Sequence, residues 1–245
     1  MESLGTPITN LSQEDLDYII GLYDGETAYV DAQVGKLLEK IDSIGFEREF
    51  LTVIVADHGE EFLDHGSASH GYTLYEEMIR VPLIVRYPRR VAPARIKAQV
   101  RVIDIMPTLF EFVGTVESEQ AIQGRSFVPL LEGKTSTGID EAFSEATYVG
   151  DRKSIRTEEG LKLIYSYADD DAMLFDLKQD PKERKSLLNG NGESPLGEPL
   201  REHLSLWMKA NQATRVALYG AEGPDQEVVL DEETKEQLEA LGYIQ

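Results

Sequence analysis

The sequence has no cysteine among its 245 residues, which excludes disulfide bonds and cysteine-ligated zinc. Basic residues are also scarce, since 24 Lys and Arg stand against 45 Asp and Glu for a formal charge of −21. That charge argues against nucleic acid and anionic membranes as partners. No apolar run approaches the roughly 18 residues of a membrane-spanning helix, and there is no Gly-x-Gly-x-x-Gly or P-loop. The chain therefore reads as a globular protein whose chemistry depends on carboxylates and histidines.

The most informative segment runs from Leu51 to Glu61. Leu51–Val55 is apolar or β-branched throughout, which predicts a fully buried strand of the kind found inside parallel sheets. This strand leads directly into Asp57 and His58. In open α/β sheets the chemistry lies just beyond the carboxyl ends of strands, so this pair is well placed to hold a metal ion.

Histidines cluster in the loop that follows. Three of the four histidines in the chain, His58, His65 and His70, lie within thirteen positions, and the last two are each followed by glycine. A random distribution would rarely give this spacing, so the pattern indicates a functional site. The alternative for Asp57 is a capping role after the strand, and for His70 a hydrogen bond to the backbone. For His65 and Glu60, supporting or solvated roles are as good an interpretation.

Periodicity predicts the other elements. Ser12 with Asp15 resembles a capping box that starts a long helix reaching to about residue 41, with close packing expected at Gly21 and Gly25. A second strand is predicted over 81–87 and a helix over 103–112, with Pro107 in its first turn or at a kink. Beyond residue 140 the sequence predicts short antiparallel strands at 153–157, 161–167 and 173–177. Helices are then expected from 180, over 200–210 and from 231 to 241.

Motifs follow one another in a distinctive order. They are Ala56-Asp57-His58-Gly59-Glu60-Glu61-Phe62, Asp64-His65-Gly66, Ser69-His70-Gly71, Tyr75-Glu76-Glu77, Arg80-Val81-Pro82, Leu174-Phe175-Asp176-Leu177, Asp180-Pro181-Lys182-Glu183 and Leu241-Gly242-Tyr243. Together they resemble the sulfatase family of the alkaline-phosphatase-like superfamily. The resemblance implies an α/β fold: part of an alkaline-phosphatase-like sandwich with a mostly parallel sheet, plus a small C-terminal antiparallel sheet with a packed helix. Residues 1–139 would form the C-terminal part of the catalytic α/β domain, and 140–245 a small α+β subdomain.

One departure from the family is decisive for activity. Sulfatases carry a Cys/Ser-x-Pro-x-Arg motif whose first residue becomes the formylglycine nucleophile, and no such motif occurs in this sequence. The chain therefore resembles the C-terminal portion of a sulfatase, without a nucleophile of its own. We expect this chain alone to be inactive.

The resemblance also assigns roles to the clustered residues. Asp57 and His58 take positions of metal ligands, and His70 takes a position where the family contacts the sulfuryl group or the leaving oxygen. His65 and Glu60 would support these groups or contact substrate. The implied cofactor is a divalent metal, calcium first, with manganese or zinc as alternatives because imidazole shifts a site toward them.

The complete enzyme would hydrolyse a sulfate ester of a small molecule or a glycan. Other members of the superfamily act on phosphorus, so a phosphodiesterase, phosphonate hydrolase or phosphoethanolamine transferase stays open, as does a non-catalytic metal-binding fragment. The sequence indicates neither a compartment nor an oligomeric state.

Overall fold

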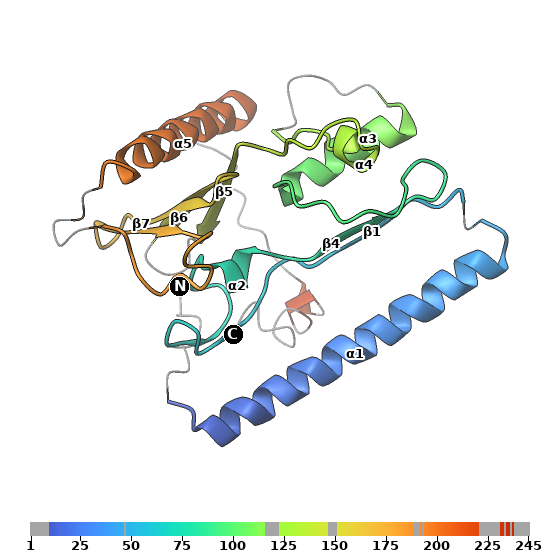
Figure 1. The fold of residues 1–245 in the computed structure, drawn as a ribbon, viewed down its shortest axis with the longest axis horizontal. Coiled ribbons are helices and arrows are strands. Elements are labelled where there is room, and N and C mark those ends of the chain that lie inside the picture. Colours follow the sequence, from blue (N-terminus) through green and yellow to red (C-terminus); the bar gives the residue numbers. More distant parts are fainter. Residues whose placement is uncertain are drawn as a thin grey trace.

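The computed structural model describes residues 10–46, 48–115, 123–146, 151–188, 192, 194–220, 231–232, 234–235 and 237. Figure 1 shows a long helix set apart from the rest, a two-stranded ribbon through the middle, and a small sheet covered by another helix. None of the helices in these ranges is both long and apolar enough to cross a bilayer.

Helix α1, Gln13–Ser43, begins at the predicted capping box. The Ser12 hydroxyl oxygen accepts from the Asp15 N–H at 3.1 Å, and the Asp15 carboxylate accepts from the Ser12 N–H at 3.3 Å. Only Ile41 of this helix is buried, and the helix runs beside the ribbon with most of its surface open (Figure 1). The close packing expected at Gly21 and Gly25 is not found among the described residues, none of which would come within 4 Å of a Cβ at either position.

Strands β1, Thr52–Val55, and β4, Leu83–Arg86, form the central ribbon. They pair antiparallel, with Val55 opposite Leu83, and the described residues contain no parallel pair. The predicted strands are confirmed, but β1 is only partly buried, where a fully buried strand was expected. Val55 is 39% and Ile84 56% exposed, since within the described ranges β1 and β4 have only each other as strand partners. An apolar run predicts a strand but not the direction of its neighbour.

The segment after β4 supports the ribbon from one side. A 3₁₀ turn η1, Val102–Asp104, leads into α3, Ile105–Val113, and α4 follows at Val128–Leu131. Pro107 lies in the first turn of α3, as predicted, where its missing N–H costs no helical hydrogen bond. The buried Asp104 carboxylate accepts from Arg101 at 2.8 Å and from the Arg125 N–H at 2.8 Å. These contacts join Arg101 and Arg125 to one buried charge.

The C-terminal sheet is antiparallel in the order β5-β6-β7-β8. Its strands are Glu141–Ala146, Arg152–Thr157, Leu161–Ser166 and Asp171–Asp176. Helix α5, Gly197–Tyr219, covers one face (Figure 1), where Ile155, Leu163 and Leu174 pack against Leu200 and Leu204. The predicted small sheet with a packed helix is confirmed, and β5 and the longer helix add to it.

Two predicted helices differ in outcome. Residues 180–183 form a turn rather than the start of a helix, because Glu183 takes a left-handed backbone with φ of 51° that ends helical geometry. The Asp231 side chain accepts from the Thr234 N–H at 2.8 Å, as a helix cap would. The predicted end of that helix at Leu241 lies outside the described residues.

The other face of the sheet meets the loop that carries the histidines. This loop holds β2, Glu61–Phe62, β3, Ala68–Ser69, and the short helix α2, Glu76–Ile79. Leu74 packs in one buried cluster with Ile164, Phe175 and Leu177. The loop therefore lies between the ribbon and the C-terminal sheet and contacts both.

An ion pair ties α5 to the sheet edge and gives a pH prediction. The Glu141 carboxylate accepts from the His203 ring, and that hydrogen bond raises the pKa of His203 above its usual 6.5. The stabilisation is therefore complete below the unfolded pKa and is lost as pH rises through the folded pKa. Because half of the His203 side chain is exposed, we expect the free energy of unfolding to fall by only about 0.5 kcal/mol. The cause of this step is measured by a nuclear magnetic resonance titration of the His203 ring, whose pKa Glu141→Gln should return toward 6.5.

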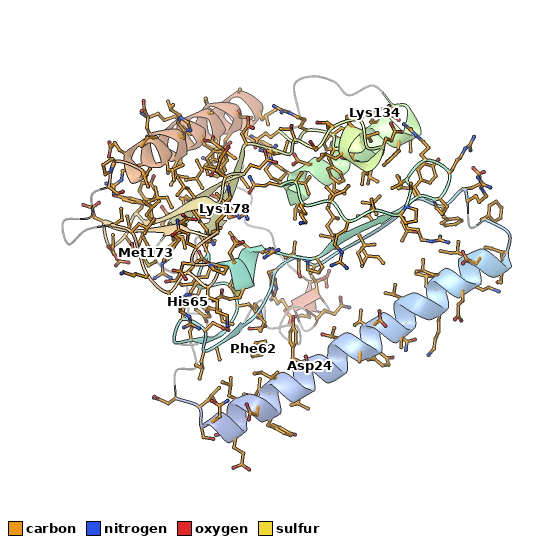
Figure 2. All side chains as sticks on the ribbon, viewed as in Figure 1. Asp24, Phe62, His65, Lys134, Met173 and Lys178 are labelled. Atoms are coloured by element: carbon orange, nitrogen blue, oxygen red, sulfur yellow. The ribbon has the colours of Figure 1, made fainter. Side chains whose placement is uncertain are left out.

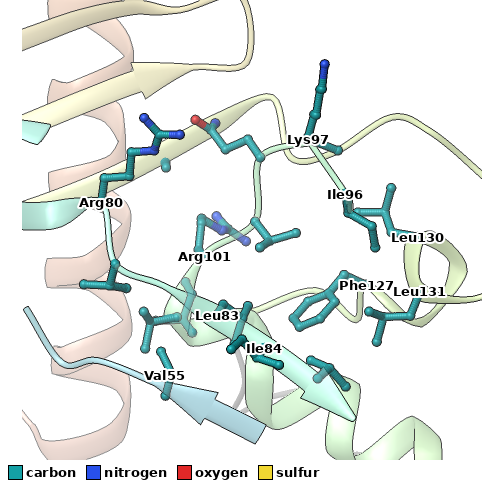
Figure 3. A pocket seen from close by; sticks show the side chains of 18 of the residues that line it. Val55, Arg80, Leu83, Ile84, Ile96, Lys97, Arg101, Phe127, Leu130 and Leu131 are labelled. Atoms are coloured by element: carbon teal, nitrogen blue, oxygen red, sulfur yellow. The ribbon is translucent and has the colours of Figure 1, made fainter. Parts of the chain in front are cut away.

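Exposed apolar side chains gather in the first half of the chain. The described exposed set there is Tyr18, Leu22, Tyr23, Tyr29, Val30, Leu37, Ile44, Phe46, Phe50, Val55, Ile84, Ile96, Val102, Ile103, Met106 and Val113. An open groove of about 1850 Å³ runs along β4, lined by Val55, Leu83, Ile84, Ile96 and Phe127 among others (Figure 3). Apolar surface of this extent marks an interaction site or an association hazard.

We therefore expect this chain alone to self-associate and to unfold without a sharp transition. Light scattering should give an average mass above 27.4 kDa that rises with concentration. Ile84→Ser should reduce this association, whereas Leu206→Ser on α5, which removes a side chain of similar exposure (56% and 55%), should not. A monodisperse monomer with a cooperative thermal transition would contradict the expectation.

Candidate metal and histidine site at the end of strand β1

The chain leaves β1 and turns back at once onto α2. The Gly59 N–H donates to the Met78 carbonyl at 2.8 Å, and the Ala56 N–H donates to the Pro82 carbonyl at 3.4 Å. A Cβ at Gly59 would lie 1.8 Å from the Glu77 carbonyl oxygen, so only glycine allows this close approach. The segment that carries Asp57 and His58 is thereby fixed at both ends.

The Asp57 and His58 side chains face one another beyond the strand. The His58 Nδ1 lies 2.8 Å from the Gly59 carbonyl oxygen, and because a carbonyl can only accept, Nδ1 carries a proton. The neutral ring then presents a lone pair on Nε2, which lies 3.8 Å from Asp57 Oδ2. Metal-binding histidines commonly donate their other N–H to a carbonyl in this way. The two donor atoms and their spacing fit a shared divalent cation.

His70 comes to the same place from β3. Its ring stacks on His58 with centroids 4.5 Å apart and an angle of 23° between planes. Its Nδ1 lies 3.0 Å from Glu60 Oε2, and the carboxylate holds the ring in one orientation. Because the Glu60 carboxylate faces Nδ1, Nε2 is the ring nitrogen that can meet a ligand. The His70 and Glu60 side chains are about one third exposed or less. The structure thus brings together Asp57, His58, Glu60 and His70 as one group.

His65 belongs to a different group. Its Nδ1 faces the Glu77 carboxylate, its Nε2 lies 3.2 Å from the Glu183 carbonyl oxygen, and its ring stacks on Tyr75 at 3.5 Å. The candidate residue His65 therefore sits behind the site, against the C-terminal part of the chain. Glu77 and Glu183 lie in motifs noted in the sequence, but nothing in their spacing indicates that both contact His65.

Glu61, His65 and Glu77 are the residues of the described part of the chain whose ligand atoms gather within 4.8 Å in a group of three. The buried Glu61 carboxylate already accepts from Thr73 at 2.8 Å and from the Ser67 hydroxyl. His65 is engaged with Glu77 and Glu183. These hydrogen bonds satisfy the group without an ion, and we interpret it as a structural network.

Two family models match the sequence. The model described as "N-sulphoglucosamine sulphohydrolase, C-terminal" matches residues 66–210, more than half of the chain, and the model "Sulfatase" matches residues 7–115. The chain belongs to the sulfatase family. The resemblance inferred from the motif order is thereby confirmed, and the sulfatase match contains all five candidate residues of the histidine-rich segment.

Similar sulfatases extend well beyond the matched region. N-acetylglucosamine-6-O-sulfatase of Bacteroides thetaiotaomicron is 32% identical over 171 residues, which cover 64% of this chain and 30% of that protein. Delta 4,5-hexuronate-2-O-sulfatase of the same organism is 28% identical over 210 residues, with 82% and 43% covered. A solved structure in complex with its substrate D-glucosamine-2-N,6-O-disulfate superposes with a TM-score of 0.64 at 29% identity and covers 75% of this chain and 39% of that one. The chain thus spans less than half of each sulfatase, and the predicted fold class is confirmed.

Proposed function

We propose that this chain is the C-terminal portion of a metal-dependent sulfatase and supplies metal and leaving-group contacts for hydrolysis of a sulfate ester. The observation that carries the proposal is the convergence of Asp57, His58 and the His70–Glu60 pair just beyond β1. By the same reasoning, residues 1–139 would be its share of the catalytic domain and 140–245 a subdomain that packs on it.

Asp57 and His58 would hold the ion. A carboxylate oxygen beside a single imidazole suits calcium, manganese or zinc, with calcium our first choice. The bound ion would act as a Lewis acid on the ester and hold the nucleophile near it. Two protein donors are too few for such a site, so the remaining ligands would come from the part of the enzyme that carries the nucleophile.

His70 would act on the leaving oxygen. Glu60 fixes Nδ1–H, so a proton on Nε2 could be donated to the oxygen as the S–O bond breaks, or its charge could stabilise that oxygen. This assignment gives each ring nitrogen a separate task.

We expect no sulfatase turnover from this chain alone. Metal and leaving-group contacts do not replace a covalent nucleophile, and this sequence has no Cys/Ser-x-Pro-x-Arg motif. Purified protein should leave 4-nitrophenyl sulfate unhydrolysed with calcium, manganese or zinc. Turnover that disappears in Asp57→Asn would contradict this expectation and would mean that another residue of this chain supplies the nucleophile.

The substrate we propose is a sulfated glycan or a related small ester. The support comes from the relatives, which are named for N-acetylglucosamine-6-O-sulfate and hexuronate-2-O-sulfate hydrolysis, and from the structure in complex with a glucosamine disulfate. The rival within the superfamily is a phosphorus ester. The nucleotide sequence upstream of the Met1 codon bears on this choice, since Cys-x-Pro-x-Arg favours a sulfatase and a threonine nucleophile favours phosphoryl transfer.

The functional test uses a reconstituted enzyme. We define this as the complex of this chain with the part of the Bacteroides N-acetylglucosamine-6-O-sulfatase that it does not match. That part should be N-terminal, because the family model over 66–210 is described as C-terminal.

Turnover is compared for 4-nitrophenyl sulfate, bis-4-nitrophenyl phosphate and a phosphonate monoester. We expect the sulfate to have the highest kcat/KM. Preference for a phosphorus ester would favour the rival, and binding without turnover of any ester would favour a non-catalytic role.

A further inference from the structure

A lysine and a glutamate are fully buried between the histidine loop and the C-terminal sheet. The side chains of Lys162 on β7 and Glu183 are both 0% exposed, and Lys162 Nζ lies 2.8 Å from Glu183 Oε1. The same ammonium lies 3.2 Å from Glu76 Oε1 at the start of α2. Burial raises the pKa of Glu183, although the Lys162 charge acts in the opposite direction. Buried charges are costly to desolvate, and the loss of one partner leaves the other uncompensated.

Glu183 contacts both ends of the segment 65–76, which carries His70. Its Oε2 accepts from the Glu76 N–H at 2.6 Å, which anchors the first turn of α2. Its backbone carbonyl accepts from His65 Nε2, 118 positions away in sequence. To place both groups, the residue adopts a left-handed backbone with φ of 51°, which is unfavourable for a side chain of this size.

His65 is held between two acceptors. The Glu77 carboxylate lies at Nδ1 and the Glu183 carbonyl at Nε2, so both ring nitrogens are engaged and the ring cannot turn without losing a contact. The ring is stacked on Tyr75, whose hydroxyl donates to Met173 Sδ at 3.3 Å (Figure 2 labels His65 and Met173). Glu61 then joins the two sides of the loop through Ser67 and Thr73. A continuous set of contacts therefore runs from β7 to the loop that presents His70.

We propose that Lys162 and Glu183 are positioning residues, which act through Glu76 and His65 to hold the loop so that His70 and Glu60 face the Asp57–His58 pair. The proposal rests on the proposed function for its catalytic consequence, but the placement of His70 is a property of this chain alone. It gives the C-terminal sheet a specific task, which is to orient the leaving-group histidine.

The chain offers a matched control. Lys153 on the neighbouring strand β6 is also buried, with 7% of its side chain exposed, and also pairs with two carboxylates, Asp151 and Glu145. Neither of those partners belongs to the histidine loop. Lys162→Met and Lys153→Met therefore remove the same buried ammonium from neighbouring strands, although the partners of Lys153 are about half exposed, and only the first removes a contact to the loop.

The first measurement is nuclear magnetic resonance of this chain with ¹⁵N-labelled histidine. We expect Lys162→Met to shift the His65 and His70 ring signals and to weaken protection of the His70 Nδ1–H, while Lys153→Met leaves them in place. Unchanged His70 signals in a folded Lys162→Met protein would overturn the proposal, whether or not any sulfatase activity exists.

The second measurement separates positioning from stability in the reconstituted enzyme. With a sugar-like or alkyl sulfate, whose leaving oxygen depends on His70, Lys162→Met should lower kcat by about 10-fold to 100-fold, as for a displaced catalytic group, with KM changed less than about twofold. The double variant with Lys162→Met and Glu183→Met removes both buried charges and should regain thermal stability. It should keep the low kcat, because the Glu183 carboxylate no longer anchors Glu76. Recovery of both stability and kcat would overturn the positioning role. Absence of turnover in the wild-type complex would instead count against the proposed function.

Discussion

Replacing Asp57 with alanine should lower kcat/KM of the reconstituted enzyme by about 10³-fold or more. Under the proposed function the Asp57 carboxylate would be one of the two donors that this chain offers to the ion, and its loss would weaken both nucleophile positioning and charge stabilisation. Loss of a single donor to the transition state already costs on the order of 10²–10³ in rate. The loss of a metal ligand should therefore be the largest single effect in the chain.

The control for this variant is Asp42→Ala. Asp42 is a half-exposed aspartate on α1 that pairs with Arg86 at 2.9 Å, and it is not one of the candidate site residues. We expect its kcat/KM to stay within about twofold of wild type, as is usual for surface ion pairs. Titration with metal should also show that Asp57→Ala requires more cation for residual activity. An equal, small loss in both variants would mean that Asp57 only caps the turn after β1.

Replacing His70 with alanine should lower the rate less than Asp57→Ala and more than His65→Ala, and the loss should depend on the leaving group. If His70 protonates or stabilises the leaving oxygen, its removal matters most for alcohols that leave poorly. For sugar-like or alkyl sulfates we expect a loss on the order of 10²-fold to 10³-fold. For nitrophenolate, which needs little assistance, the loss should be small.

The measurement is kcat/KM for His70→Ala across aryl sulfates of graded leaving-group pKa. The slope against leaving-group pKa should become steeper than in the wild type. Glu60→Gln should move the slope in the same direction by a smaller amount, since it keeps His70 but weakens its hold on Nδ1–H. His203→Ala on α5 is the control histidine and should leave the slope unchanged. A uniform loss for every ester would exclude proton donation by His70.

Local rules predicted much of the fold. The Ser12–Asp15 capping box starts α1 at the expected residue, Pro107 lies in the first turn of α3, and three of the four strands of the C-terminal sheet were expected. Each of these signals depends on residues close in sequence. Strand β5 was missed because Glu141–Ala146 has weak alternation and is stabilised by its pairing with β6.

What the sequence could not predict depends on distant partners. The direction of the β1–β4 pair follows from the path of the loop between them, which no apolar run encodes. Asp180–Glu183 has the composition of a helix start, yet Glu183 is drawn into contact with Lys162, His65 and Glu76. The burial of Lys162 could not be predicted from the alternation of its strand, because a charged residue ordinarily indicates the exposed face.

The same distinction between local and distant signals applies to the candidate site. The clustering of His58, His65 and His70 in sequence indicated a site, and the structure brings His58 and His70 into contact. His65 is only five positions from His70, yet it faces the C-terminal sheet. Sequence proximity located the loop, but the side-chain directions come from the turns at Leu63 and Gly66, both with left-handed backbone.

The most direct measurement is a titration of the nucleophile-bearing sulfatase part with this chain, followed by hydrolysis of 4-nitrophenyl sulfate in the presence of calcium. Neither component alone should turn over the ester. The rate should rise with added chain and saturate at one chain per partner, and Asp57→Asn chain should compete for the same partner while giving no turnover. Binding that saturates with no turnover from the wild-type chain, under calcium, manganese or zinc, would contradict the account that this chain supplies the metal and leaving-group half of a sulfatase.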